Sequence, residues 1–154
     1  MTKFEKVTEN RFVADGGAAA DYETIKLPKR ATAGSAGYDF YAPAELRIAA
    51  GETVKIPTGI RCQMDNDRVL AIFPRSGLGF KFKLALDNTV GIIDADYYGA
   101  DNEGHIMIKM TNRGDKDLTV EKGKAFAQGI FLAYYLTDDD DASGVRVGGF
   151  GSTN

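Results

Sequence analysis

Hydrophobic and polar residues alternate with a period of two along much of the chain, which is the spacing of a half-buried β-strand. The alternating segments are residues 24–27, 53–56, 60–64, 80–86 and 106–111. Two more continuous apolar runs, 69–73 and 130–136, fit strands that are buried on both faces. One helical turn is expected over residues 18–22. Many short strands separated by glycine-containing turns predict an all-β fold, an antiparallel sandwich or barrel.

Length and composition indicate one globular domain. The chain has 154 residues, of which 44% are hydrophobic and 27% charged. The composition changes at four consecutive aspartates, 138–141, which repel one another and stay solvated. We therefore expect a β domain over residues 1–137, in which 1–22 form an N-terminal extension. An acidic linker over 138–144 and a glycine-rich arm over 145–154 are expected to follow.

The scarce residue types exclude several classes of site. The 19 Lys and Arg against 22 Asp and Glu give a net charge of -3, which argues against a broad basic surface for nucleic acid. One histidine, His105, and one cysteine, Cys62, cannot form a Cys-based or two-histidine zinc site, or a disulfide within the chain. The first residues contain no apolar signal core, and no apolar run is long enough to span a bilayer. We expect a cytoplasmic protein without a nucleic-acid or membrane partner.

The segment Pro74-Arg75-Ser76-Gly77 is the first candidate for an anion site. The two common phosphate loops that open a helix, G-x-x-x-x-G-K-[ST] and G-x-G-x-x-G, are missing, so a loop between strands would have to bind a phosphate. Arg75 offers a bidentate fork, Ser76 a hydroxyl, and Gly77 a backbone that a ligand can approach closely. The alternative is a plain turn at the end of a strand.

Three aspartates are candidates for a general base or for metal binding. Asp94 and Asp96 directly follow an apolar run, and in an extended strand they would share a face. Either could orient a water as a general base, or could bond its own backbone in a turn. Asp39 is a third acid, close to Gly37. Carboxylate oxygens suit Mg²⁺, which often fills its remaining positions with water and phosphate oxygens.

Other candidates have a structural and a functional interpretation. His105 is expected in a hairpin turn, because no second metal-type ligand is grouped with it. Cys62 alternates with apolar residues, which favours a core position over a nucleophile. The glycine-rich arm is either a frayed terminus or a segment that orders over a ligand. In the second case Phe150 would stack on the ligand and Arg146 would clamp an anion.

Five short segments, in their order along the chain, resemble the five motifs of the trimeric dUTP diphosphatases (dUTPases). They are AGYDF at 36–40, PRSGLG at 74–79, NTVGIIDADY at 88–97, GKAFAQ at 123–128 and GGFGST at 148–153. Five segments in the right order are far more specific than one. The resemblance covers the chain from about residue 24 to its end. It implies a jelly-roll-like β fold with a flexible C-terminal arm that closes over the active site.

The same resemblance implies an enzyme, a homotrimer with active sites between subunits, and hydrolysis of dUTP to dUMP and pyrophosphate with Mg²⁺. Such a reaction limits uracil incorporation into DNA and supplies dUMP for dTTP synthesis. By analogy, Asp94 would bind the deoxyribose 3′-hydroxyl and orient the attacking water at the α-phosphorus. Tyr97 would pack on the sugar and leave no room for a 2′-hydroxyl. Asp39 would hold waters of the Mg²⁺ shell.

The resemblance assigns the other substrate-binding residues to three groups. The uracil edge would be read by Asn88, Gly91, Ile92 and Ile93. The phosphates would be held by Arg75, Ser76, Gly77 and Gln128. The arm would contribute Phe150, capping the uracil, and a set that closes over the terminal phosphate, Arg146, Gly151, Ser152 and Thr153.

The chain also departs from the family pattern. After Gly99, residues 100–105 form a longer loop than usual, which could bring His105 close to the site. This loop could instead be an inert insertion or a surface for a regulatory protein partner. Arg146 stands one residue closer to the Gly-Gly-Phe-Gly segment than the commonest spacing. Two alternatives to the hydrolase therefore stay open: a dCTP deaminase-like enzyme of the same fold, and a dUTP-gated regulatory binding protein.

Overall fold

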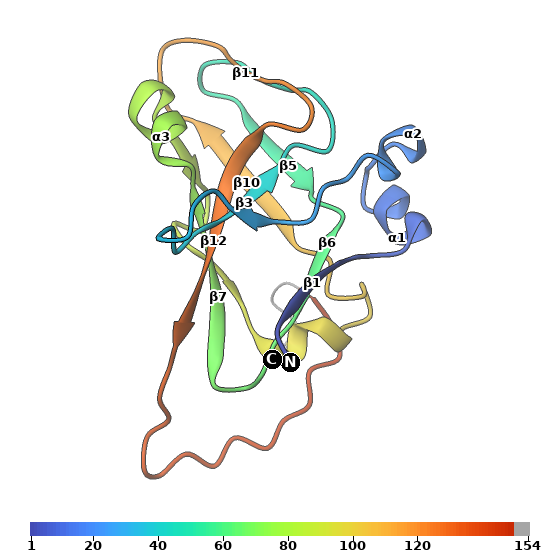
Figure 1. Cartoon of the computed structure of the whole chain (residues 1–154), viewed down its shortest axis with the longest axis vertical. Coiled ribbons are helices and arrows are strands. Elements are labelled where there is room, and N and C mark those ends of the chain that lie inside the picture. Colours follow the sequence, from blue (N-terminus) through green and yellow to red (C-terminus); the bar gives the residue numbers. More distant parts are fainter. Residues whose placement is uncertain (150–154) are drawn as a thin grey trace.

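The computed structural model describes residues 1–149, and most of its elements are short strands (Figure 1). In chain order the elements are β1 (Lys3–Lys6), α1 (Glu9–Ala14), α2 (Ala19–Tyr22), β2 (Lys29–Arg30), β3 (Tyr38–Tyr41), β4 (Leu46–Ile48), β5 (Thr53–Pro57), β6 (Ile60–Gln63), β7 (Arg68–Pro74), α3 (Ser76–Phe82), β8 (Leu84–Leu86), β9 (Gly91–Ile93), the 3-10 helix η1 (Ala95–Gly99), β10 (Met107–Asn112), β11 (Leu118–Val120) and β12 (Ala125–Ala133). None of the helices within residues 1–149 has the length and apolar character that a bilayer-spanning segment needs. The prediction of an all-β fold is confirmed.

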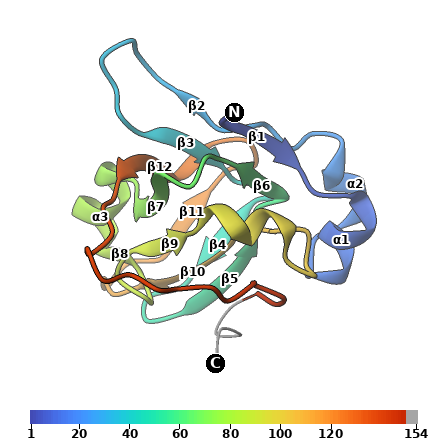
Figure 2. The ribbon, with the colours of Figure 1, turned by 90° about the horizontal axis from the view of Figure 1, so that it is seen from below.

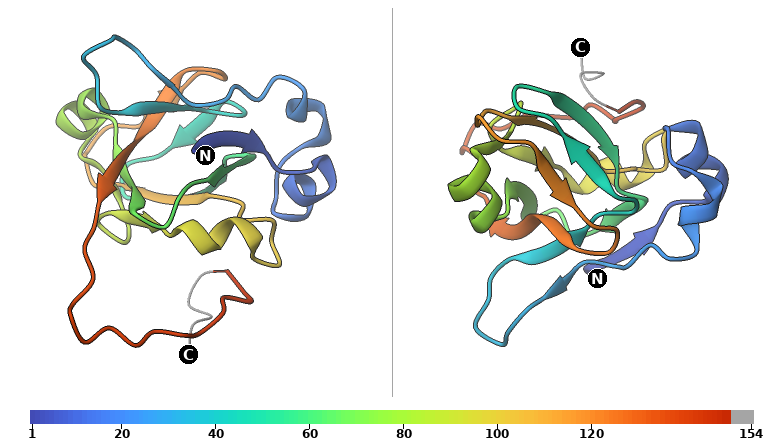
Figure 3. Two further views of the ribbon diagram at one scale, coloured as in Figure 1. Left: turned by 60° about the horizontal axis from the view of Figure 1, so that its bottom comes forward. Right: turned by 90° about the horizontal axis from the view of Figure 1, so that it is seen from above.

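The strands form antiparallel sheets around one interior (Figures 1 and 3). The largest sheet has five strands in the order β2-β3-β12-β7-β9, and a second has three in the order β5-β10-β8. Two-stranded sheets, β11-β4 and β1-β6, complete the fold. Large apolar side chains from different sheets meet in the core, among them Phe40, Ile72, Ile108, Met110 and Phe126. Burial of this shared core is the main favourable term that holds the sheets together.

The N-terminal segment, residues 1–22, packs into the same core. Strand β1 pairs with β6, and Phe4 lies opposite Cys62 in this pairing. Val7 and Phe12, which flank the start of α1, are both almost fully buried. Cys62 is a core residue, as predicted, and burial raises the pKa of its thiol to about 12. A thiol with that pKa is no nucleophile near neutral pH.

Several of the predicted elements are confirmed by the structure. Residues 53–56, 60–64, 69–73 and 106–111 coincide largely with β5, β6, β7 and β10, and the helical turn expected at 18–22 is α2. The predicted strand at 24–27 is wrong. The amide of Ile25 donates to the carbonyl of Tyr22 at 3.2 Å, which continues the turn that ends α2. The ammonium group of Lys26 instead donates a hydrogen bond to the carbonyl oxygen of Gly123 at 3.2 Å.

The predicted strand over residues 80–86 is only partly right, because its first half is the end of helix α3. Leu78 and Phe82, four residues apart, both pack against the core, which is helical spacing. Phe80 lies between them in sequence and is 92% exposed. Lys83 then adopts a left-handed conformation, φ 53°, which ends the helix before β8 begins.

The apolar run 130–136 was expected to be buried on both faces, and the structure corrects this at its C-terminal end. Strand β12 ends at Ala133, and Leu132, Tyr134, Tyr135 and Leu136 are all exposed. Beyond β12 the chain leaves the sheet and returns alongside η1 (Figures 1 and 2). Residues 145–149 are the described part of the arm.

Candidate functional site

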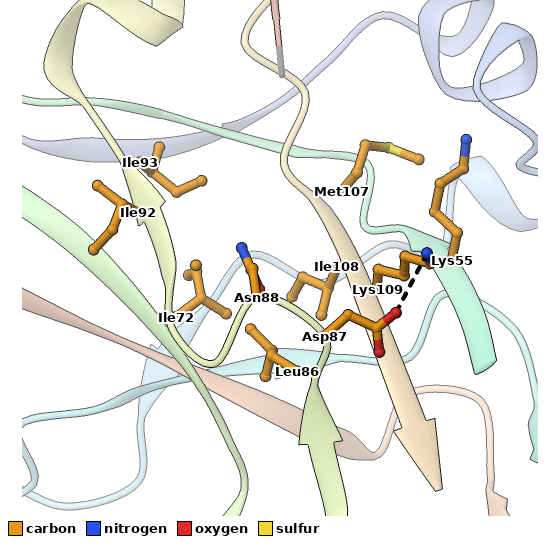
Figure 4. Close-up of a pocket in the computed structure, with 11 residues that line it drawn as sticks. Lys55, Ile72, Leu86, Asp87, Asn88, Ile92, Ile93, Met107, Ile108 and Lys109 are labelled. Carbon is orange, nitrogen blue, oxygen red and sulfur yellow. Dashed lines mark ion pairs between the residues drawn. The ribbon is translucent and has the colours of Figure 1, made fainter. Parts of the chain in front are cut away.

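One cavity lies where the β8–β9 hairpin meets β10, and we call it the hairpin pocket. It has a volume of about 280 Å³ and is lined by Lys55, Ile72, Leu86, Asp87, Asn88, Gly91, Ile92, Ile93, Met107, Ile108 and Lys109. Figure 4 shows the amide of Asn88 among aliphatic side chains, with Asp87 and the two lysines grouped at one end. The pocket thus combines apolar walls around the Asn88 amide with charged side chains at one end, which suits a flat heterocycle.

The turn that carries Asn88 has a constrained backbone. The amide of Thr89 donates to the carbonyl of Leu86 at 3.1 Å, which closes a tight turn. Thr89 has φ 67°, a left-handed conformation that a β-branched residue seldom adopts. Gly91 starts β9, and a Cβ there would lie 3.1 Å from the Cβ of Ile72. Glycine therefore keeps this wall of the pocket open.

The second cavity, which we call the arginine cleft, is larger and more polar. It has a volume of about 790 Å³ and is lined by Ala31, Ser35, Ala36, Gly37, Asp39, Arg75, Ser76, Gly77, Leu78, Lys81, Phe82, Ala125, Gln128 and Ile130. Arg75 Nε lies 3.5 Å from Asp39 Oδ1, and Gln128 Nε2 donates to the carbonyl of Pro74 at 3.2 Å. A Cβ at Gly37 would lie 2.4 Å from Gln128 Oε1, so a larger residue there would displace this side chain.

Arg75 and Ser76 lie at the start of a helix, which corrects the expected loop between strands. Arg75 is the N-cap residue of α3, and Ser76 is its first helical residue. The carbonyl of Arg75 accepts hydrogen bonds from the amides of Leu78 and Gly79, both at 3.0 Å. The amides at the very start of a helix have no carbonyl partner within it and point outward. The cleft therefore offers backbone donors as well as a guanidinium group.

The hairpin pocket and the arginine cleft lie on opposite faces of the five-stranded sheet. Paired residues of antiparallel strands project to the same face, and neighbours along a strand project to opposite faces. Asp39 pairs with Gln128, and Gln128 pairs with Phe73, so the carboxylate and the amide share a face. Ile72, next to Phe73, pairs with Gly91 and projects to the other face. Among residues 1–149, no residue lines both cavities.

Asp94 and Asp96 were expected to share a face of an extended strand, and this is wrong. Asp94 caps η1 after β9 has ended, and Asp96 lies inside η1. One arginine of the arm nevertheless brings the two carboxylates together. Arg146 Nη2 donates to Asp94 Oδ2 at 2.6 Å, and its Nε donates to Asp96 Oδ1 at 2.7 Å. The guanidinium carbon also lies 5.9 Å from the centre of the Tyr97 ring.

The loop 100–105 turns inward, and His105 is not in a hairpin turn as predicted. His105 is completely buried and lies immediately after the turn. Tyr97, also buried, donates its hydroxyl proton to the carbonyl of His105 at 2.7 Å. Asn102 Nδ2 in turn donates to the Tyr97 hydroxyl oxygen at 2.7 Å. Burial lowers the pKa of His105 and raises that of Tyr97.

The structure therefore divides the predicted site residues between three places. The hairpin pocket contains Asn88, Gly91, Ile92 and Ile93. The arginine cleft contains Asp39, Arg75, Ser76, Gly77 and Gln128. The contact with the arm contains Asp94, Tyr97 and Arg146. Four predicted residues lie outside the described part of the chain, namely Phe150, Gly151, Ser152 and Thr153.

Among the described residues, a single carboxylate of the arginine cleft is the candidate for metal binding. Within residues 1–149, no group of three or more His, Cys, Asp and Glu could hold a metal ion by itself. Asp39 is the carboxylate of the arginine cleft. Mg²⁺ commonly binds through one or two carboxylates together with water and substrate phosphates, so this cleft fits an ion that arrives with a phosphate ligand.

Comparison with known proteins identifies the family of the chain. The dUTPase family model matches residues 23–154. A deoxyuridine 5′-triphosphate nucleotidohydrolase from Lactococcus lactis subsp. lactis (strain IL1403) is 43% identical over 132 residues, covering 84% of this chain and 88% of the relative. The chain belongs to the dUTPase family.

Solved dUTPase structures agree with the fold. The dUTPase from Streptococcus mutans superposes with a TM-score of 0.71 at 40% identity, covering 88% of this chain and 98% of that one. A mutant dUTPase from phage phi11 of S. aureus, whose structure describes a structural Mg(II) ion, has a TM-score of 0.67 at 16% identity, covering 94% and 97%. At that identity only the fold is compared. The expected jelly-roll-like class is confirmed.

Some lining residues of the hairpin pocket were not predicted from the sequence. Leu86, Met107 and Ile108 belong to strands on which every second residue faces the core, so nothing in the pattern distinguishes pocket from core. Lys55 and Lys109 pair directly across β5 and β10. Only this pairing reveals two adjacent cations at the rim of a dUTPase-family pocket.

Proposed function

We propose that the chain hydrolyses dUTP to dUMP and pyrophosphate, which limits uracil incorporation into DNA and supplies dUMP for dTTP synthesis. The observation that carries this proposal is the pairing of two unlike cavities in a dUTPase-family chain. The hairpin pocket, at about 280 Å³, accommodates a base, while the arginine cleft gathers donors suited to phosphates. The reaction requires both kinds of site.

The base and sugar would be recognised on the hairpin side. Asn88 and the backbone of Gly91 and Ile93 would read the uracil edge inside the hairpin pocket. The buried Tyr97 would pack on the deoxyribose, where a 2′-hydroxyl finds no room. Asp94, directly after β9, would bind the 3′-hydroxyl and accept a proton from the water that attacks the α-phosphorus. The bond from the α-phosphorus to the bridging oxygen breaks, and pyrophosphate leaves.

The phosphates would be held in the arginine cleft. Arg75 presents its fork there, and Ser76, Gly77 and Gln128 add hydroxyl, amide and side-chain donors. A chain of net charge -3 needs concentrated positive charge to bind a triphosphate. Mg²⁺, held by phosphate oxygens and by water bonded to Asp39, would neutralise charge on the leaving pyrophosphate.

We infer that the chain acts as a homotrimer whose active sites are shared between subunits. One dUTP must reach both a hairpin pocket and an arginine cleft, yet within one chain these lie on opposite faces of a sheet. Strands β3 and β9 are separated by β12 and β7, a distance of about 14 Å at ordinary strand spacing. A second copy supplies the missing half most simply. The exposed apolar residues Leu132, Tyr135 and Leu136 provide a surface that such a contact would bury.

The arm would close the site when dUTP binds. In the free chain Arg146 pairs with Asp94 and Asp96. A terminal phosphate offers Arg146 several anionic oxygens on one group, which suits a bidentate fork, so we expect the guanidinium to exchange the carboxylates for phosphate and to free Asp94. Phe150 would then cap the uracil, and Gly151, Ser152 and Thr153 would close over the terminal phosphate.

A nucleotide panel tests the proposed function. The purified chain is incubated with Mg²⁺ and dUTP, dCTP, dTTP or UTP, and pyrophosphate and ammonia are measured separately. We expect pyrophosphate from dUTP, far less from the other three, and no ammonia. Ammonia from dCTP would instead support a deaminase, and tight dUTP binding without turnover would support a regulatory binding protein.

A further inference from the structure

The only histidine of the chain is buried and is hydrogen-bonded to a partly buried aspartate 90 residues away in sequence. His105 Nδ1 lies 2.6 Å from Asp15 Oδ2, and the amide of Gly59 donates to His105 Nε2 at 2.8 Å. Because Nε2 accepts from an N–H group it carries no proton, so Nδ1 carries the proton and donates it to Asp15. Both ring nitrogens are therefore satisfied, and the ring has one allowed orientation.

Asp15 is itself held in place by Arg11 of helix α1. Arg11 Nε donates to Asp15 Oδ2 at 3.0 Å, and Nη2 donates to Oδ1 at 2.6 Å, so the fork is bidentate. The hydrogen bonds from His105 and Arg11 outweigh burial and keep the pKa of Asp15 below its usual range. Near neutral pH the carboxylate is thus charged and can accept bonds from both partners.

The other end of α1 is attached to the same loop. Thr8, the N-cap residue of α1, donates its amide to Glu103 Oε2 at 2.8 Å and its hydroxyl to Oε1 at 2.7 Å. The loop 100–105 is consequently fastened to both ends of a helix in the N-terminal segment. Figure 3 shows the loop, in yellow, lying beside α1, in blue.

The opposite side of the loop holds the tyrosine of the candidate site. The carbonyl of His105 accepts the Tyr97 hydroxyl, and Asn102 donates to the same hydroxyl oxygen. His105 cannot shift without losing its bond to Asp15 or to Gly59, so its carbonyl has a fixed position. A continuous series of contacts therefore runs from α1 through His105 to Tyr97.

We propose that Asp15 and His105 are positioning residues that set the Tyr97 ring and so determine the discrimination of deoxyribose from ribose. This inference rests on the proposed function, in which Tyr97 excludes a 2′-hydroxyl. Exclusion of a single hydroxyl by steric contact requires a ring that cannot retreat, because a displacement of about 1 Å is enough to change the fit. The family match begins at residue 23, so α1 adds this constraint from outside the matched region.

The test compares Asp15→Asn with Asp21→Asn. An asparagine at 15 must direct its NH₂ group at either His105 or Arg11, both of which are donors. Asp21 belongs to the same N-terminal segment but pairs with Lys122, away from the loop, at 2.5 Å. For each variant, kcat and KM are measured with dUTP and with UTP by pyrophosphate release, and folding is checked by thermal unfolding.

We expect Asp15→Asn to lower the ratio of kcat/KM for dUTP over UTP by about tenfold or more. The Asp21→Asn ratio should stay within about twofold of the unmodified chain, since its lost pair is exposed. A purely structural role would lower the Tm and both activities alike and leave the ratio unchanged. A folded Asp15→Asn variant with the unmodified ratio would therefore overturn the proposal.

A milder variant covers the case in which Asp15→Asn fails to fold. Arg11→Gln removes the fork from Asp15 but leaves the buried histidine its acceptor, so we expect a smaller fall in the ratio, about threefold. An unchanged ratio in folded Arg11→Gln would then overturn the proposal. If the unmodified chain released no pyrophosphate from dUTP, the proposed function would fail, and this inference with it.

Discussion

The hairpin pocket and the arginine cleft differ in chemistry, in size and in the face of the sheet on which they lie. The pocket has aliphatic walls, one amide side chain and a backbone held open by Gly91, so it selects by shape. The cleft is nearly three times larger and places Arg75, Gln128 and the start of a helix around one carboxylate, Asp39. It selects by charge. A ligand with a flat base and a polyphosphate would need both, which is the reason for proposing that two chains contribute to each site.

The largest effect on hydrolysis is expected for a substitution of Asp94, which directly follows strand β9 of the hairpin. In Asp94→Asn the side chain keeps its shape but no longer accepts a proton from water, so kcat for dUTP should fall by about 10² or more. Binding of dUTP should remain, because no cavity is altered. Asp138→Asn, in the acidic linker, is the matched control and should leave kcat unchanged. An Asp94→Asn enzyme with unmodified kcat would exclude Asp94 as the base.

A smaller effect is expected for the arginine cleft at Arg75. In Arg75→Gln a charged fork is replaced by a neutral amide, so affinity for dUTP should fall by about 10- to 100-fold. Affinity for dUMP, with fewer phosphate charges, should fall less. Titration calorimetry with both nucleotides measures the difference. Arg47→Gln removes an exposed arginine that pairs with neighbouring Glu45 and serves as the control. Equal losses for dUTP and dUMP would contradict a triphosphate role for the cleft.

A third variant acts on the shape of the hairpin pocket. In Gly91→Ala the new methyl group would lie 3.1 Å from the Ile72 Cβ, so the pocket narrows. We expect dUTP and dUMP to lose affinity alike, by about tenfold, in contrast to the unequal losses from Arg75→Gln. Gly34→Ala, where a Cβ meets nothing within 4 Å, should bind normally. If Gly91→Ala lowered the affinity for dUTP but not for dUMP, the proposed difference between the two cavities would be wrong.

The smallest expected effect is a decrease in the free energy of unfolding as the pH falls, caused by His105. His105 faces Asp15, Arg11 and Glu103, and burial lowers its pKa below the usual 6.5. As the pH falls below about 6.5 the unfolded chain takes up a proton before the folded one, so the free energy of unfolding decreases by up to about 1.4 kcal/mol per pH unit. Thermal unfolding between pH 7.5 and 5.5 should show this slope, and His105→Gln should lack it. If the unmodified chain and His105→Gln lost stability to the same extent as the pH fell, His105 would not be neutral in the folded chain.

Alternation along the chain predicted β5, β6 and β10, each of which has one face in the core, and a continuous apolar run predicted β7. Several shorter strands, namely β1, β2, β3, β4, β9 and β11, were not predicted. Helix α3 was missed because Phe80 and Lys81 alternate like a strand, while the informative pair is Leu78 and Phe82 at helical spacing. Local pattern cannot decide between two periods in so short a segment.

The site residues were easier to predict than their arrangement. Arg75 and Asp94 were identified from residue type and motif, which are local properties. The placement of the hairpin pocket and the arginine cleft on opposite faces depends on the register of β3, β12, β7 and β9, which is set by packing. The pairing of His105 with Asp15 joins residues 90 apart, and no sequence period connects them. Long-range pairings of this kind emerge only from the folded chain.

The central claim is that each active site combines the hairpin side of one chain with the arginine cleft of another. Asp94→Asn and Arg75→Gln chains, each strongly impaired alone, can be co-expressed with different affinity tags and the mixed oligomers purified. In a trimer that contains both kinds of chain, about one in three of the shared sites combines an intact Asp94 from one chain with an intact Arg75 from another. We therefore predict that dUTP hydrolysis by the mixed trimers recovers to about one third of the unmodified rate. Activity no higher than the mean of the two separate variants would contradict shared sites.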